Sequence, residues 1–268
     1  MSLLQAVVLG FVQGLTEFIP ISSSGHLVIV PELLGWEPSG LAFDVLLHIG
    51  SLLALLIYFS GELLDLVRGI FSGDREQRRL FWLLVVGTIP AVVVALAFAS
   101  YFEEAFDDAS AAAIQLLFTA VILVAAEQFL RFHERRTAEQ GSRLRGMKDF
   151  NLTDAAVVGA GQAVAILPGI SRSGSTIAAG LGLGFERDDS ARFSFLLAIP
   201  ALLGAALEQT PEISNSSLGL GAGIAGFLAS LIASYAAIAG LIRYLRSNTL
   251  YPFAVYCLVA GVIFYLLV

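Results

Sequence analysis

GFVQGLTEFIPISSSGH, residues 10–26, returns in altered form as GAGQAVAILPGISRSGS, residues 159–175. The second stretch begins 149 residues after the first. The shared residues are Gly10, Gln13, Ile21, Ser22, Ser24 and Gly25, which fall on Gly159, Gln162, Ile170, Ser171, Ser173 and Gly174. Chance similarity between two Gly/Ser-rich stretches is one explanation. The better explanation is a duplicated unit, as many membrane proteins have.

The composition around these stretches indicates an all-α integral membrane protein. Hydrophobic residues make up 57% of the 268 residues, charged residues only 14%, and the mean hydropathy is +0.83. A soluble domain usually carries about 25% charged residues, and a spanning helix needs about 20 apolar residues. Apolar runs near that length lie at 41–59, 80–99, 111–130, 218–242 and 255–268 with its lead-in.

The two quoted stretches interrupt apolar segments that are too short to span. Residues 1–34 and 152–184 each break into halves of about 12–18 residues, which suits a re-entrant helical hairpin. Three full spans then follow each hairpin, near 41–60, 80–100 and 110–131, and near 190–208, 218–242 and 250–268. Because three crossings is an odd number, the second unit is expected to be inverted, so that both hairpin tips meet near the midplane.

We therefore expect one membrane domain, 1–268, with repeats at about 1–132 and 151–268 and a basic cytoplasmic linker at 133–150. On this topology one face receives 14 of the 15 basic residues. The opposite loops, EEAFDD (103–108) and EQTPE (208–212), contain none. The positive-inside rule makes the basic face cytoplasmic and places both termini outside.

Other whole-chain signals are weak. No cleavable signal is expected, because the first basic residue is Arg68. The single cysteine, Cys257, excludes an internal disulfide. The net charge is −7, and nothing in the chain resembles a basic patch for nucleic acid. The expected partners are a lipid substrate and membrane lipid, and a homodimer is left open.

Arg172 is the one basic residue outside the basic face. An arginine at membrane depth costs at least ~2.5 kcal/mol on insertion scales, so it marks a function or a partner. It lies in PGISRSGST, residues 168–176, which offers a guanidinium fork, hydroxyls and exposed N–H groups. These groups bind phosphate. The predicted phosphate ligands are Arg172, Ser171, Ser173, Gly174 and Thr176, with Ser22 from the first stretch. The alternative is a ligand-free pairing of Arg172 with a carboxylate such as Glu17.

The first stretch supplies the candidate reactive groups. Gln13 and Glu17 are four residues apart and therefore share one face of a helix. Glu17 suits a hard cation, Mg²⁺ or Ca²⁺, held jointly with substrate phosphates. Ser23 is a candidate nucleophile with His26 as its base. His26 as the nucleophile, or His26 merely satisfied by local hydrogen bonds, are the alternatives.

Three further polar residues are weaker candidates. Asp44 and His48 are four residues apart on the first full span, where they either line the site or form a link at the helix end. Glu127 is expected near the cytoplasmic end of its span, snorkelling or paired with Arg131.

Residues 13–26 and 168–176 together resemble the signature motifs of the undecaprenyl pyrophosphate phosphatase family, the bacitracin-resistance type. The similarity extends over the whole chain, including residues 125–127, 193–200 and 251–256. It implies an enzyme, a phosphoric anhydride hydrolase, that converts C55-isoprenyl pyrophosphate to the monophosphate and inorganic phosphate. Such a hydrolase recycles the lipid carrier of peptidoglycan and cell-wall synthesis. The resemblance also implies metal dependence, inverted repeats and a site open toward the outer face of the bacterial inner (plasma) membrane.

The resemblance assigns roles residue by residue. Glu17 and Gln13 match the motif acids, and Ser23 and His26 match the proposed nucleophile or base. The matches to the pyrophosphate-binding loop are Arg172, Ser171, Ser173 and Thr176. Gln13 departs from the commoner glutamate, and a neutral amide supplies no charge to a cation. Either Glu17 holds the metal with phosphate oxygens and waters, or Gln13 only orients the substrate.

The leading rival is a secondary transporter or lipid flippase with an anion site at the midplane, because broken helices in inverted repeats are transporter architecture. A carrier does not need Glu17, Ser23 and His26 beside Arg172. A structural scaffold would leave both Arg172 and Glu17 without a purpose.

Overall fold

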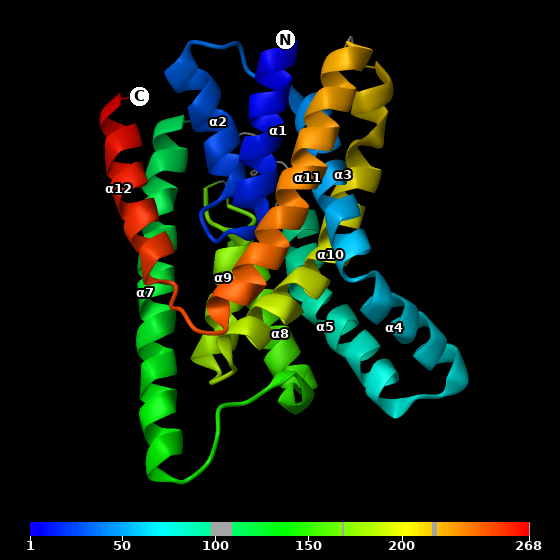
Figure 1. The fold of residues 1–268 in the computed structure, drawn as a ribbon, viewed down its shortest axis with the longest axis vertical. Helices are drawn as coiled ribbons and strands as arrows, with labels where there is room; N and C mark the ends of the chain where they lie inside the picture. The colour runs from blue at the N-terminus through cyan, green and yellow to red at the C-terminus, as the bar shows by residue number, and fades with distance from the viewer. Residues whose placement is uncertain (98–108, 168, 216–218, 268) are drawn as a thin grey trace.

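The computed structural model describes residues 1–97, 109–167, 169–215 and 219–267 (Figure 1). Within these ranges the regular structure is helical, apart from an isolated bridge between Arg145 and Phe185. The helices are α1 (Leu3–Phe18), α2 (Ser23–Leu34), α3 (Leu41–Tyr58), α4 (Ser60–Ser72), α5 (Arg75–Ala97), α7 (Ala109–Glu139), η1 (Met147–Asp149), α8 (Leu152–Val164), α9 (Arg172–Gly182), α10 (Arg187–Asn215), α11 (Leu220–Leu245) and α12 (Tyr251–Leu267). The all-α prediction is confirmed.

Five helices in the described ranges are long and apolar enough to cross a membrane. They are α3, α5, α7, α10 and α11. Two further apolar helices are shorter: α1 has 16 residues and α12 has 17. The chain is therefore a multi-pass membrane protein.

Each interrupted segment folds as two short helices with a turn between them. Figure 1 shows α1 and α2 in the upper half of the bundle and α8 and α9 in the lower half, with the two turns near mid-height. Both chain termini lie at the upper end. The second helix of each pair is capped in the same way: the Ser22 hydroxyl accepts the N–H of Gly25, and the Ser171 hydroxyl accepts that of Gly174. These equivalent caps explain why the Ser-x-Ser-Gly pattern occurs twice, since a serine before a helix satisfies N–H groups that have no partner in the helix.

Glycines bring the first helix of each pair into backbone contact with a spanning helix. A Cβ added to Gly10 in α1 would overlap the carbonyl oxygen of Gly226 in α11. A Cβ added to Gly159 in α8, the equivalent of Gly10, would overlap the carbonyl oxygen of Gly87 in α5. Small residues allow such close approach between helices inside a membrane. The packing fixes both short helices against long ones and so fixes where their turns lie.

The apolar core lies directly beneath the end of α1. Phe18, fully buried, packs edge-on against Phe195 of α10 with ring centroids 5.3 Å apart. Phe150, Phe185 and Phe193 form a stack below the second hairpin, with centroids 3.7 and 4.4 Å from Phe150. Glu17 is therefore next in the chain to a fully buried residue of the apolar core.

Three segments expected to be loops contain helix: 61–79, between the first two expected spans, the linker 133–150 and the acidic loop 208–212. The last lies within α10, which continues to Asn215. α4 occupies most of the expected loop 61–79, because Leu63, Leu66 and Ile70 give it an apolar face that packs on the core. Arg192 of α10 forms an ion pair with Glu62 of α4 at 2.7 Å. α7 continues to Glu139, seven residues into the expected linker 133–150. The acidic loop 103–108 lies outside the described residues.

The pairing expected for Glu127 is wrong. Its side chain is fully buried and accepts hydrogen bonds from the Arg187 guanidinium at 2.7 and 3.0 Å and from the Leu250 N–H at 2.7 Å. Arg131 lies instead over the ring of Tyr251, 4.9 Å from its centroid. Glu127 faces into the bundle where α10 begins, whereas Arg131 is one turn further along α7 and lies on its outer side. Glu127 therefore ties α7 to the starts of α10 and α12.

Candidate active site

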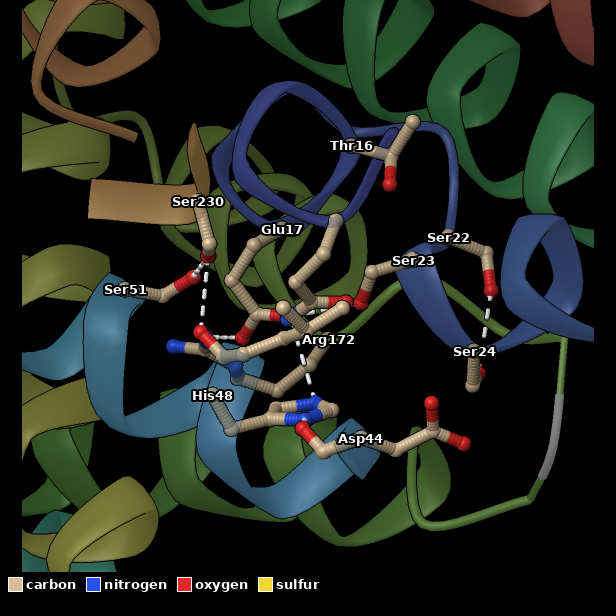
Figure 2. A network of polar contacts seen from close by, with 12 residues as sticks. Thr16, Glu17, Ser22, Ser23, Ser24, Asp44, His48, Ser51, Arg172 and Ser230 are labelled. Carbon is tan, nitrogen blue, oxygen red and sulfur yellow. Dashed lines mark hydrogen bonds and ion pairs between the residues drawn. The ribbon is translucent and has the colours of Figure 1, made fainter. Parts of the chain in front are cut away.

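Glu17, in the last turn of α1, is the centre of the polar network in Figure 2. One carboxylate oxygen, Oε1, accepts a hydrogen bond from Arg172 Nη2 at 2.5 Å. The other, Oε2, accepts the Ser23 hydroxyl at 2.5 Å and Gln13 Nε2 at 3.0 Å. The Glu17 side chain is 6% exposed and that of Arg172 is 16% exposed. The structure thus brings residues from both hairpins to one buried carboxylate, and it contains the Glu17–Arg172 pair that the sequence offered as an alternative.

Gln13 and Arg172 each keep one polar atom without a partner. Gln13 lies on the same helix face as Glu17, as predicted, and its Oε1 has no hydrogen-bond partner in the described structure. Arg172 Nη1 is also buried and unpaired within the described residues. A buried N–H donor without a hydrogen-bond partner costs free energy. The unpaired Nη1 of Arg172 is therefore suited to bind an anion.

The turn of the first hairpin depends on a strained serine. Ser22 has φ 67°, the only positive φ of a non-glycine residue in the described ranges. A backbone in this region costs about 1–3 kcal/mol. The turn directs the Ser22 carbonyl to the ring of His26, with its oxygen 2.7 Å from Nδ1. It also starts α2 at Ser23, which places the Ser23 hydroxyl against Glu17.

The second hairpin turn carries the predicted phosphate loop. The hydroxyls of Ser171 and Ser173 lie 3.2 Å apart, and Ser171 also caps Gly174. Thr176 points elsewhere: its hydroxyl lies 2.6 Å from Ser194 Oγ in α10 and donates to the Arg172 carbonyl at 2.8 Å. The contact with Ser194 connects α9 to α10 in this structure. The bond to the Arg172 carbonyl lies within α9 and is the i−4 bond that threonine often forms in a helix.

The two turns are in direct contact with each other. The Gly169 N–H donates to Ser24 Oγ at 3.3 Å. Thr119 of α7 joins them from the side: it donates to the Gly169 carbonyl at 3.3 Å and accepts the Ser171 N–H at 3.1 Å. Sequence reasoning missed Thr119, whose only signal was a hydroxyl in an apolar run. Thr119 is only 1% exposed. Its hydrogen bonds to Gly169 and Ser171 therefore connect the second turn to a residue inside the bundle.

Thr119→Val is expected to lower the melting temperature in detergent by about 5 °C. Valine keeps the shape but leaves the Gly169 carbonyl and the Ser171 N–H unpaired, a loss of about 2 kcal/mol. Thr88→Val is the matched control, because the Thr88 hydroxyl only back-bonds to Leu84 in its own helix. Equal melting temperatures for the two variants would contradict the bridging role of Thr119.

His48 of α3 joins the site from a third direction. Its Nδ1 donates to the Asp44 carbonyl at 2.8 Å, which orients the ring, and its Nε2 lies 3.7 Å from Glu17 Oε2. The Asp44 carboxylate turns away to accept the Ser39 hydroxyl at 2.6 Å. Of the two weaker candidates on this span, only His48 reaches Glu17 (Figure 2).

His26 points away from Ser23 and toward α12. Its Nε2 lies 2.7 Å from the Tyr256 hydroxyl, and the two rings stack with centroids 5.7 Å apart. Phe264 packs edge-on against the same ring. The predicted Ser23–His26 pair is therefore not formed, because Glu17 binds the Ser23 hydroxyl while the Ser22 carbonyl and the Tyr256 hydroxyl take both ring nitrogens of His26. Tyr256 was not predicted as a site residue, although it ends the stretch 251–256 that is part of the resemblance.

The described residues fit a divalent cation only when the substrate supplies most of its ligands. They contain no group of three or more His, Cys, Asp or Glu side chains placed to hold a metal. Both Glu17 oxygens already accept hydrogen bonds, and the Gln13 Oε1 oxygen is the unpaired oxygen beside them. Mg²⁺ binds through one or two protein oxygens plus substrate phosphates. A carboxylate, a free amide oxygen and an anchored diphosphate meet that requirement.

Comparison with known proteins gives consistent matches over nearly the whole chain. The family model described as "Bacitracin resistance protein BacA" matches residues 6–263. A relative from Gloeobacter violaceus, named undecaprenyl-diphosphatase, is 42% identical over 260 residues, covering 94% of this chain and 87% of its own. Relatives with the same name come from Methanosphaera stadtmanae (40% identical, covering 98% and 97%) and Idiomarina loihiensis (38% identical, covering 100% and 99%).

Proposed function

The chain belongs to the bacitracin resistance protein BacA family, and from this membership we propose that it hydrolyses undecaprenyl diphosphate to the monophosphate and inorganic phosphate. Relatives that match it over almost their full length carry the name undecaprenyl-diphosphatase. The observation that carries the proposal is Glu17, which contacts a hydroxyl nucleophile, Ser23, and a phosphate-binding group, Arg172, at the same time. A carrier has no use for the Glu17–Ser23 contact.

Arg172 is the group that binds the diphosphate. Its Nη2 donates to Glu17 Oε1, and its Nη1 has no hydrogen-bond partner in the described structure. A fixed guanidinium binds phosphate oxygens in pairs and needs no reorganisation when charge develops. Ser22, Ser171, Ser173 and Gly174, at the starts of α2 and α9, are the further groups that we propose for the phosphate. Most catalysis of phosphoryl transfer comes from such charge stabilisation.

Ser23 is the proposed nucleophile and Glu17 its base. The Ser23 oxygen attacks the terminal phosphorus as the bond to the bridging oxygen breaks, and the hydroxyl proton passes to Glu17 Oε2. Glu17 then gives that proton to the departing monophosphate. Water, deprotonated by Glu17, then attacks the phosphorus of the phosphoserine; the bond from phosphorus to Ser23 Oγ breaks, Glu17 returns the proton to Oγ, and inorganic phosphate leaves. Direct attack by water on the diphosphate is the competing route, and trapping of a phosphoserine would separate the two.

A divalent cation, Mg²⁺ or Ca²⁺, completes the proposal. When bound, it supplies positive charge to the diphosphate oxygens. Glu17 and the Gln13 Oε1 oxygen are the protein groups that would hold it.

The membrane arrangement proposed for this site has six full spans and two re-entrant hairpins in an inverted repeat. The opposite placement of α1–α2 and α8–α9 in Figure 1, and the equivalent serine caps of α2 and α9, support it. The last turns of α7, which carry Arg131, Arg135 and Arg136, lie at the end away from the termini (Figure 1), and we assign this basic end to the cytoplasm. The termini and the opening of the site then face the outside of a bacterial inner membrane.

The test is phosphate release from undecaprenyl diphosphate by the purified protein in detergent. We expect release with Mg²⁺ or Ca²⁺, loss of release on chelation with EDTA, and recovery when the cation returns. A soluble pyrophosphate without the lipid tail is the control for a substrate bound in the membrane. Absence of release with any divalent cation, together with uptake of the lipid diphosphate by vesicles containing the protein, would contradict the proposal in favour of a transporter or flippase.

A further inference from the structure

His48 faces the Glu17 carboxylate with one of its ring nitrogens (Figure 2). Its Nδ1 lies 2.8 Å from the Asp44 carbonyl oxygen, and a carbonyl only accepts, so Nδ1 carries a hydrogen. The other nitrogen, Nε2, is directed at Glu17 Oε2. A histidine that binds a metal usually has this arrangement, because a carbonyl or a carboxylate accepts its second N–H and fixes the ring.

The spacing of His48 Nε2 and Glu17 Oε2 suits a shared cation better than a hydrogen bond. The two atoms are 3.7 Å apart, whereas an N–H···O hydrogen bond spans about 2.7–3.2 Å. Two ligands that are each about 2.1 Å from one cation lie about 3–4 Å apart. An ionised carboxylate has about four acceptor sites, and the described donors Arg172, Ser23 and Gln13 use three of them. One acceptor site of Glu17 therefore remains for a cation.

Gln13 brings an oxygen to the same place. Its Nε2 donates to Glu17 Oε2 at 3.0 Å, and its Oε1 is buried without a partner in the described structure. Because an amide is neutral, Gln13 alone is a weak companion to Glu17 in holding a cation. The lone pair of an imidazole nitrogen is a stronger ligand, so His48 supplies what the amide lacks. The diphosphate oxygens then fill the remaining positions around the cation.

We propose that His48 Nε2 is a ligand of the divalent cation, which makes the site select cations that accept nitrogen, such as Co²⁺, over Ca²⁺. Ca²⁺ takes oxygen ligands, whereas imidazole suits transition metals. The inference rests on the proposed function for the role of the cation in catalysis, but binding of the cation is measured without turnover. His26 does not compete for this role, because the Ser22 carbonyl and the Tyr256 hydroxyl engage both of its ring nitrogens.

The first arm of the test measures cation affinity in His48→Asn, which keeps a side-chain N–H near the Asp44 carbonyl and removes Nε2. Co²⁺ and Ca²⁺ are titrated into the purified protein in detergent with farnesyl methylenediphosphonate, whose P–C–P bridge is not hydrolysed. We expect the Kd for Co²⁺ to rise at least about tenfold, because loss of a group that only orients a ligand already costs about 10–100-fold. The Kd for Ca²⁺ should stay within about threefold.

His133→Asn is the matched control for this change. The His133 Nε2 lies 3.0 Å from the Gly182 carbonyl oxygen, at the opposite end of α9 from Arg172. Both cation affinities should therefore stay as in the wild type.

The second arm detects the bound ring itself. In the Co²⁺-loaded protein, the unpaired electrons of the metal shift the Nδ1–H proton of a bound histidine far outside the normal NMR range. We expect one such exchangeable signal in the wild type and in His133→Asn, and none in His48→Asn. If His48→Asn does not fold, His48→Gln takes its place, because glutamine also lacks the ring N–H.

A role of His48 only as a charged partner of Glu17 predicts something different. No shifted N–H signal would then appear in the wild type, His48→Asn would change the Co²⁺ and Ca²⁺ affinities by the same factor, and the proposal is overturned. A signal that persists in His48→Asn, or a wild type that binds no Co²⁺, overturns it as well. Phosphate release without the shifted signal leaves the proposed function intact and removes only His48 as a ligand. The shifted signal without phosphate release from undecaprenyl diphosphate by any cation does the reverse.

Discussion

Glu17→Gln is expected to lower kcat for phosphate release by about 10³-fold, within the usual range for loss of a general base. Glutamine has the size of glutamate and stays hydrogen-bonded to its neighbours, but it takes no proton from Ser23. It also removes the counter-charge of Arg172, whose contact at 2.5 Å then joins a cation to a neutral amide. The measurement is phosphate release at saturating undecaprenyl diphosphate and divalent cation.

Glu32→Gln is the control for this experiment. Glu32 lies on α2, in the same hairpin, but is exposed, so its neutralisation should leave kcat as it is. A Glu17→Gln protein with a normal melting temperature and a rate near that of the wild type would remove Glu17 from the mechanism. It would also leave Ser23 without a base among its hydrogen-bond partners in the described structure.

Arg172→Lys is expected to lower kcat/KM by about 10²–10³-fold, the usual cost of losing a donor that stabilises transition-state charge. The substitution keeps the charge but not the geometry. Arg172 uses one nitrogen for Glu17 and holds the other free, whereas a lysine ammonium is a single point charge on a flexible stem. We expect both a higher KM and a lower kcat, because ground-state binding and charge stabilisation are lost together.

Arg143→Lys is the matched control for Arg172→Lys. Its side chain is 75% exposed and forms only a 3.6 Å pair with Asp149, so the same chemical change there should not alter the rate. Full activity of Arg172→Lys would show that charge alone suffices. The guanidinium fork of Arg172 would then not be required for catalysis.

Local patterns in the sequence were sufficient to predict the elements that carry the site. The repeat of Ser22 and Ser24 at Ser171 and Ser173 predicted a break in each apolar segment, and at each break the structure has a turn followed by a helix that a serine caps. The spacing of Gln13 and Glu17 predicted one helix face, which their hydrogen bond confirms. These features depend on neighbours a few residues away, where periodicity and capping rules apply.

Contacts between distant segments could not be predicted in this way. The partner of Ser23 depends on the positive φ of Ser22, and a serine in that region carries no sequence mark. Tyr256 and Thr119 reach the turns from α12 and α7, and their roles follow from how whole helices pack. Helix α4 was not predicted for a similar reason. It has only 13 residues, and a helix this short is stable only when its apolar face packs against the core.

The pairing of Glu17 with Arg172 also constrains how the chain is made. The two residues are separated by 155 positions, so at about 5–20 residues per second the ribosome delivers the arginine roughly 10–30 s after the glutamate. During that interval the nascent first hairpin has no counterion for its acid and no Gly169 N–H for Ser24. An unpaired charge is costly at membrane depth. The first hairpin therefore cannot form the contacts that complete its turn until the second repeat has been translated.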